Sequence, residues 1–119
     1  MKREELINYL KDAYDVEPEY MWAKYPNFCV FRYGHGRKWF TILMDAPNKT
    51  LGIGDSGTTD VIDVRLAPTQ IDDLLASKTP GFLPAYHMNK SNWISVVIEQ
   101  VTKEQLIKLI AASWENTQK

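Results

Sequence analysis

The feature that most constrains the fold is a pair of apolar, β-prone runs on either side of a glycine-containing turn. Residues 28–31 read Phe-Cys-Val-Phe, residues 38–44 read Lys-Trp-Phe-Thr-Ile-Leu-Met, and residues 33–36 read Tyr-Gly-His-Gly. Aromatic and β-branched side chains favour strands, and glycine tolerates the positive φ angles of tight turns. The pattern predicts a β-hairpin over residues 28–44.

Helical periodicity occurs at both ends of the chain and once in the middle. Apolar residues recur at three- and four-residue spacing over residues 3–14, between Pro68 and Ser77, and after Thr102. This spacing places apolar side chains on one helix face. Pro68 suits a first helical turn, and Thr102 with Gln105 is typical of a capping box. We therefore expect three helices.

Other segments complete an α+β pattern. Residues 61–66 and 93–98 predict strands, residues 20–22 a short strand, and residues 50–53 a brief pairing within a polar loop. The order of elements predicts an antiparallel β-sheet with N- and C-terminal helices packed on one face and an extra helix in the middle of the chain. The expected core residues are Leu6, Leu10, Phe31, Trp39, Ile42, Val64, Leu75, Ile94, Val96, Leu106 and Ile110.

Length and composition place the chain among small globular proteins. Its 119 residues fit one domain, residues 1–119, which needs no disulfide or metal for stability. No apolar run reaches the ~20 residues of a membrane span. A lone Cys29 cannot close an intrachain disulfide and suggests a reducing compartment, so we expect a cytoplasmic protein. Between Phe28 and Val30, Cys29 is interpreted as a core side chain.

The charge is low but unevenly distributed. A formal net charge of -1 argues against avid nonspecific binding to nucleic acid. Residues 20–44 and 74–98, however, contain no Asp or Glu. If these two stretches lie side by side, they form a positive face suited to anions. The alternative is that strands simply carry few carboxylates.

The hairpin is the first candidate binding segment. Arg32, Arg37 and Lys38 are interleaved with aromatic residues around the turn, so these cations are candidate phosphate contacts and His35 a candidate groove contact. The alternative interpretation makes the hairpin a scaffold whose charges keep a sheet edge soluble.

Residues 86–93 form the second candidate segment. Tyr86, His87, Asn89 and Lys90 bring a phenol, an imidazole, an amide and an ammonium group into one short stretch. Asparagine reads adenine, and lysine reaches phosphate or guanine. Alternatively, His87 and Asn89 hold an irregular loop together through backbone hydrogen bonds.

The residues predict no enzyme, metal or cofactor. Residues 52–57 match G-x-G-x-x-G, but a strand follows where a dinucleotide site needs a helix. Two histidines and one cysteine offer no metal-ligand spacing. The rival enzyme hypothesis makes His87 a general base beside Lys90 in a cleft.

Residues 81–90, Gly-Phe-Leu-Pro-Ala-Tyr-His-Met-Asn-Lys, followed by Trp93, closely resemble the signature of the MmcQ/YjbR family of small bacterial proteins. Residues 22–26, 30–33, 38–40 and 43–45 resemble that family's N-terminal strands. The resemblance runs from about residue 19 to residue 114. It implies a CyaY-like α+β fold and a DNA-binding role through two wings, and it brings no catalytic residues.

By position, the wings correspond to residues 32–38 and to a loop near residues 48–57 or 86–92. The loop at 45–60 carries Asp45, Asp55 and Asp60 against Lys49 alone, which argues against it as a phosphate-facing wing. The expected function is weak, non-catalytic DNA binding through the hairpin and the Tyr-His-Met-Asn-Lys loop. The alternative is a protein-interaction or small-ligand-binding module.

Overall fold

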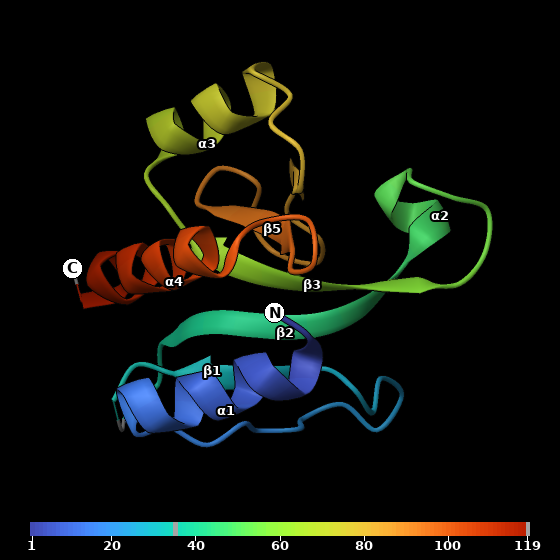
Figure 1. Ribbon diagram of the computed structural model, residues 1–119. Helices are drawn as coiled ribbons and strands as arrows, with labels where there is room; N and C mark the ends of the chain where they lie inside the picture. The colour runs from blue at the N-terminus through green and yellow to red at the C-terminus, as the bar shows by residue number, and fades with distance from the viewer. Residues whose placement is uncertain (35, 119) are drawn as a thin grey trace.

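The computed structural model describes residues 1–34 and 36–118. Five strands form one antiparallel sheet in the order β1-β2-β3-β5-β4 (Figure 1). The α+β class is therefore confirmed. The elements in chain order are α1 (Arg3–Tyr14), β1 (Cys29–Arg32), β2 (Trp39–Pro47), α2 (Asn48–Leu51), β3 (Thr58–Arg65), α3 (Pro68–Ala76), β4 (Phe82–Pro84), β5 (Trp93–Val97) and α4 (Lys103–Gln118).

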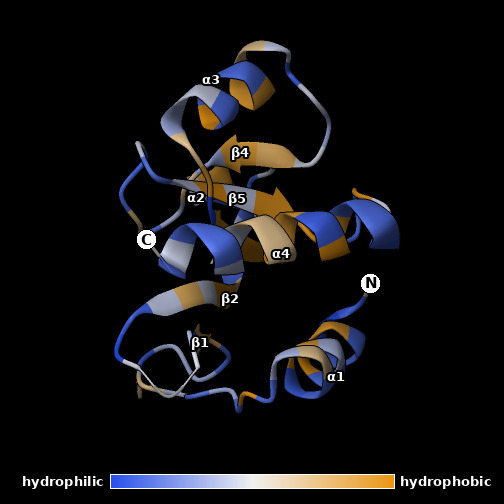
Figure 2. Cartoon of the chain, turned by 90° about the vertical axis from the view of Figure 1, so that its left-hand side faces the viewer, coloured by the Kyte–Doolittle hydropathy of each residue, from blue (hydrophilic) through white to orange (hydrophobic). Residues whose placement is uncertain are grey.

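The main hydrophobic core lies between the sheet and the long helices. Leu6 and Leu10 of α1 and Leu106 of α4 are fully buried in one cluster with strand residues such as Phe31 and Ile62. Figure 1 shows α1 and α4 crossing the same face of the sheet. In Figure 2 these helices carry both hydrophobic and hydrophilic positions, as expected when one side meets the core and the other meets water. Nine of the eleven predicted core residues are buried, while Trp39 and Leu75 are half-buried.

The capping box at the start of α4 forms as predicted. The Gln105 amide donates to the Thr102 hydroxyl at 3.1 Å, and the Thr102 amide donates to the Gln105 side-chain oxygen at 2.9 Å. These bonds satisfy two backbone groups that a helix start leaves without partners.

The opposite face of the sheet is also apolar, but loops cover it. Its buried residues form a second cluster, packed under half-buried side chains from residues 22–25, from α2 and from residues 83–88. Strands buried on both faces read as continuous apolar runs, which explains the sequence of β1 and β2. The members of this second cluster are Phe28, Val30, Ile42, Met44, Ala46, Val61 and Val97.

The predicted hairpin is confirmed and contains a bulge. Cys29 pairs with Leu43 and Phe31 with Thr41, but Arg32 pairs with Trp39, so Phe40 is the extra residue on β2. An extra residue bends a strand and increases its twist locally. The bulge therefore turns the end of the hairpin relative to the rest of β1 and β2.

Two short segments differ from the prediction. Residues 20–22 form no strand, and pairing there consists of one bridge between Glu19 and Val30. Asn48–Leu51 is a single helical turn, where we expected strand pairing over 50–53. The Asn48 side chain donates to the carbonyl of Ser56 at 2.9 Å and accepts from Thr59, so local bonds replace a strand ladder.

Strand β4 was not predicted. It has three residues and ends in Pro84, and it pairs with β5 from Phe82 opposite Val96 to Pro84 opposite Ile94. Proline cannot donate to a ladder and belongs on edge strands, which is where β4 lies. Among the described residues, no helix is long and apolar enough to cross a membrane.

Candidate functional site

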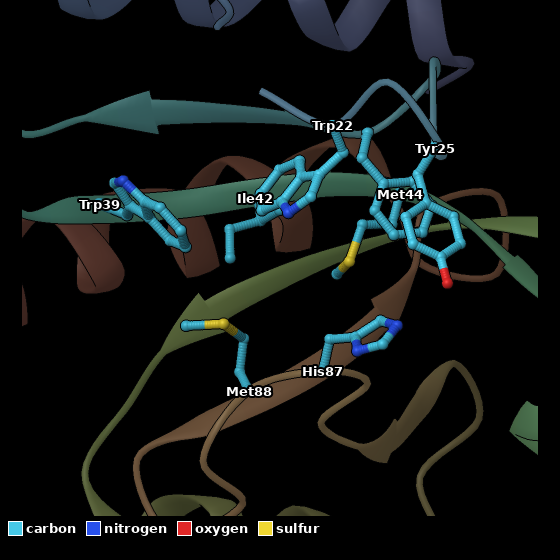
Figure 3. A pocket seen from close by; sticks show the side chains of 8 residues that line it. Trp22, Tyr25, Trp39, Ile42, Met44, His87 and Met88 are labelled. Atoms are coloured by element: carbon cyan, nitrogen blue, oxygen red, sulfur yellow. The ribbon is translucent and has the colours of Figure 1, made fainter. Parts of the chain in front are cut away.

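The loop-covered face of the sheet holds a cleft of about 250 Å³. Figure 3 shows Trp22 and Tyr25 along one side of it, His87 and Met88 along the other, and Met44 between them. Strand β2 supplies the floor, and two loops far apart in sequence supply the walls. We call this site the aromatic cleft; its lining residues are Trp22, Tyr25, Phe28, Trp39, Ile42, Met44, His87 and Met88.

Ring-to-ring contacts hold the first wall in place. Tyr25 stacks on Phe28 with ring centroids 4.7 Å apart. Trp22 meets Trp39 edge to face at 5.9 Å and Phe28 at 6.1 Å. Such pairs contribute about 0.5–1.5 kcal/mol each beyond the area that they bury. The wall is therefore preformed rather than assembled from independent side chains.

His87 stands at the centre of the second wall. Its ring centroid lies 4.2 Å from that of Tyr86 and 6.1 Å from that of Tyr25. Its φ angle of 64° is in the left-handed region, which is uncommon for residues other than glycine. Backbone strain of this kind is concentrated at ligand-binding and catalytic sites. The residue is nevertheless exposed, so its imidazole is accessible from solvent.

The loop that carries His87 is tied to the sheet by buried groups. The Tyr86 amide donates to the Ser95 hydroxyl at 2.8 Å, and that hydroxyl donates to Oδ1 of Asp63 at 2.5 Å. Asp63 and Ser95 are both fully buried. Burial raises the pKa of Asp63 to about 8, against smaller opposing effects of the Ser95 hydrogen bond and the Lys90 charge.

Two predicted binding residues also organise this loop. Lys90 Nζ donates to the Ala85 carbonyl at 2.6 Å and closes the loop on itself. The side-chain oxygen of Asn89 accepts from the Ser91 amide at 2.8 Å, and the backbone carbonyl of Asn89 accepts from the Trp93 amide at 3.0 Å. Asn89 therefore makes the loop hydrogen bonds that the alternative interpretation expected, and its contact with a base stays a prediction.

The hairpin cations are placed differently from one another. Arg32 Nε donates to Glu19 at 2.8 Å, and its NH1 group donates to the Arg37 carbonyl at 2.9 Å, so this guanidinium is already engaged. Arg37 and Lys38 are exposed. His35, the predicted groove contact, lies outside the described residues. Tyr33 packs on Trp114 of α4 at 4.2 Å, which fixes the base of the turn against the body of the protein.

The two stretches without carboxylates do lie side by side, because Tyr25 and Phe28 contact Tyr86 and His87. They meet through aromatic rings at the cleft rather than as a continuous basic face. Lys24 Nζ lies 5.8 Å from the Tyr25 ring centroid at the edge of this contact. Asp15, Glu17 and Glu19 lie with Arg32 and Arg37 along a separate groove, so the positive charge of the hairpin is partly balanced.

A second cleft of about 320 Å³ lies on the other side of the Tyr86–His87 pair. Both His87 and Lys90 line it, together with Thr50 and Leu51 of α2. His87 thus separates two clefts on the loop-covered face. The Tyr86 ring lines this second cleft and packs on the second core cluster, and burial raises the pKa of its phenol.

The Cys29 and 52–57 segments weighed in the sequence form a core side chain and a connecting loop. Cys29 is fully buried, and burial raises the pKa of its thiol to about 11. The glycine-rich stretch at 52–57 is an exposed loop leading into β3, as its context predicted. No group of three potential metal ligands comes together among residues 1–34 and 36–118.

Sequence reasoning missed most of the cleft. Trp22, Tyr25, Phe28, Met44 and Met88 were not predicted as site residues. One signal was available, because residues 28–31 and 39–44 are apolar at nearly every position and so predict burial on both faces of the sheet. With helices expected on one face, other segments had to cover the second face. Residues 20–27 contain three aromatic residues, and residues 86–88 read Tyr-His-Met.

These features define a class: a small α+β domain whose sheet is covered by helices on one face and by aromatic loops on the other. The YjbR family model matches residues 11–116, and the chain belongs to the YjbR family. An uncharacterized protein of Bacillus subtilis, YyaQ, is 33% identical over 118 residues, which is 98% of each chain.

Solved structures share this fold. The crystal structure of a Pseudomonas syringae protein matches with a TM-score of 0.92 at 37% identity, covering 98% of this chain and 99% of that one. A Deinococcus radiodurans protein with a DUF419 domain matches with a TM-score of 0.66 at 17% identity, covering 91% of this chain and 75% of that one. The second likeness concerns the fold alone.

Proposed function

We propose that this protein is a weak, non-catalytic DNA-binding protein that accepts an unpaired base in the aromatic cleft. The observation that supports the proposal is the meeting of the hairpin and the Tyr-His-Met-Asn-Lys loop at one aromatic site. Every base has a flat π face, and stacking on protein aromatic rings contributes about 1–3 kcal/mol per base.

The cleft favours a single strand over a duplex. A base in a duplex is already stacked and paired, so entry into a cleft lined by Trp22 and Trp39 would require it to leave the helix. A base in a single strand has no such cost. We therefore expect duplex DNA to bind more weakly than a single strand of the same length.

Electrostatics predict modest affinity. Exposed cations near the cleft and hairpin include Lys24, Arg37 and Lys38. Arg32 also pairs with Glu19, and Lys90 donates to a backbone carbonyl. Three phosphate contacts would give a salt slope of about -2, at ~-0.7 per phosphate for a single strand. The formal net charge of -1 adds no long-range attraction.

Fluorescence anisotropy with labelled oligonucleotides tests the proposal. Single-stranded and duplex probes are titrated at ~50 and ~200 mM salt, with wild type and the Trp22→Ala and Arg37→Glu/Lys38→Glu variants. The charge-matched control is Lys103→Glu/Lys108→Glu on α4, across the sheet from the cleft. Binding that is absent at low salt, or equal in all variants, contradicts DNA binding at this site.

A small flat ligand is the second candidate for the same cleft. Its volume of about 250 Å³ equals about eight waters at ~30 Å³ each, enough for a compact ring system. Small-molecule sites are typically concave and aromatic with few polar groups, and here His87 and Tyr25 carry the titratable side chains. Saturable binding of an aromatic compound that Trp22→Ala abolishes, without oligonucleotide binding, would favour this candidate.

A further inference from the structure

The buried carboxyl of Asp63 is the group in the described chain whose position calls most clearly for a role. Its Oδ1 accepts from Ser95, but its Oδ2 is buried and has no hydrogen-bond partner. An ionised carboxylate without partners is costly inside a protein, whereas a neutral carboxyl is much less so. The site therefore favours the protonated acid.

Asp63 lies next to a residue that lines the aromatic cleft. Its neighbour across the sheet on β2 is Ile42, which lines the cleft, and its neighbour on β5 is Ser95. Ser95 holds the amide of Tyr86, the residue before His87. The carboxyl thus supports the loop that forms the second wall of the cleft.

We propose that Asp63 is a proton-sensitive anchor for this wall, and that its ionisation loosens the loop and opens the aromatic cleft. When the carboxyl is neutral, Lys90 stays on the Ala85 carbonyl. The Ser95 hydroxyl donates to Asp63 in either charge state and keeps the Tyr86 amide on the sheet, so the bond that ionisation can release is the one that closes the loop. When it ionises, the buried negative charge attracts the Lys90 ammonium. Because the Lys90–Ala85 bond closes the loop, its loss frees His87 and Met88 to move.

The surroundings of Asp63 supply little competing charge. Ile42 on β2 and Leu83 on β4, which pairs with Ser95, are apolar, and Ser95 on β5 carries a hydroxyl. The titratable groups of the covering loop are Tyr86, His87 and Lys90, and Lys90 is the one whose charge acts on Asp63. The device regulates the site of the proposed function, but its operation is measurable without any ligand.

The experiment follows the carboxyl and the loop together by NMR. In isotope-labelled wild type, the chemical shifts of the Asp63 carboxyl carbon and of the Tyr86 and Met88 amides are recorded from pH 5 to pH 9.5. We expect a shared transition near pH 8 that is absent in Asp63→Asn. A separate oligothymidine titration reports whether the affinity changes over the same pH range. Failure of DNA binding would leave the loop result intact.

Ser95→Ala and Thr41→Val form the matched pair of variants. Both remove one buried hydroxyl bound to Asp63, but Thr41 donates to the Asp63 backbone carbonyl at 2.7 Å and has no bond to the loop. Ser95→Ala should speed hydrogen exchange at the Tyr86 amide at least tenfold relative to Thr41→Val. The proposal would be overturned if Asp63 titrates below pH 5, or if the chemical shifts of the loop amides do not change as Asp63 titrates. Equal hydrogen-exchange rates at the Tyr86 amide in the two variants would also overturn it.

Discussion

Ser113 of α4 donates its hydroxyl to the backbone carbonyl of Phe40, the extra residue in the β2 bulge. The same hydroxyl accepts from the Arg65 amide at the end of β3, at 2.7 Å. One fully buried side chain thus satisfies a carbonyl and an amide where the regular ladder is interrupted. The bulge and the last helix depend on each other.

Ser113→Ala should therefore lower the free energy of unfolding by about 1–3 kcal/mol, because two buried backbone groups lose their partner. Urea unfolding followed by circular dichroism measures the change. Ser77→Ala is the control, since its hydroxyl is exposed at the end of α3, and it should cost well under 1 kcal/mol. Equal effects of the two variants would mean that water replaces the Ser113 hydroxyl with no loss in the free energy of unfolding.

Asp63→Asn should change the pH dependence of stability. The pKa of Asp63 is raised from 3.8 to about 8 on folding, so between these values the folded state holds a proton that the unfolded chain has released. Wild-type stability therefore falls as pH rises from about 4 to 8, by at most about 1.4 kcal/mol per pH unit from this group, and levels off above 8.

The measurement is urea unfolding of wild type and Asp63→Asn at several pH values. The pKa of Asp60 is also raised, first by burial, but that group is present in both proteins and cancels in the difference. The stability difference should move steadily in favour of Asp63→Asn as pH rises to 8. A difference that stays constant from pH 5 to pH 8 would refute the raised pKa.

Cys29 should resist thiol reagents in the folded protein. It is fully buried, and burial raises its thiol pKa to about 11, so little reactive thiolate exists at neutral pH. Labelling with a disulfide reagent should proceed at the rate of unfolding and accelerate in urea. An exposed thiol made by Ser56→Cys in a Cys29→Ser background is the control and should react within seconds to minutes. Rapid native-state labelling of Cys29 would contradict this account.

Gly81→Ala should destabilise the protein more than Gly34→Ala. Both glycines have positive φ angles, 92° and 54°, so both substitutions carry a left-handed penalty of about 1–2 kcal/mol. At Gly81 an added Cβ would also lie 3.0 Å from Val101 Cγ1, whereas nothing lies within 4 Å of the corresponding position at Gly34. Thermal unfolding measures the stability of both variants. An equal loss of stability would show that the Val101 side chain moves aside at no cost.

The sequence predicted the long elements well because each depends on its own local pattern. The hairpin, the three main helices and the capping box at Thr102 follow from periodicity, turn residues and caps within a few positions. The strand β4 and the helical turn at Asn48 do not, because three or four residues carry too little pattern and are fixed by their neighbours.

The candidate site was harder to predict because it depends on contacts between distant segments. Lys90 and Arg32 are cations in the sequence, yet one closes its own loop and the other pairs with Glu19. Which partner a charge finds is a property of the fold. The cleft itself brings Trp22 and Met88 to one site from segments far apart in the sequence, and no local pattern predicts that arrangement.

The two edge strands of the sheet, β1 and β4, differ in structure, and each hinders the addition of a further strand. On the open edge of β1, Glu19 pairs with Val30 through two backbone hydrogen bonds of 3.0 Å. Strand β4 is three residues long and ends in Pro84. Long, open edges pair readily with other chains and promote aggregation. The molecule therefore offers poor templates for intermolecular β-pairing, and a binding partner would have to engage its side chains instead.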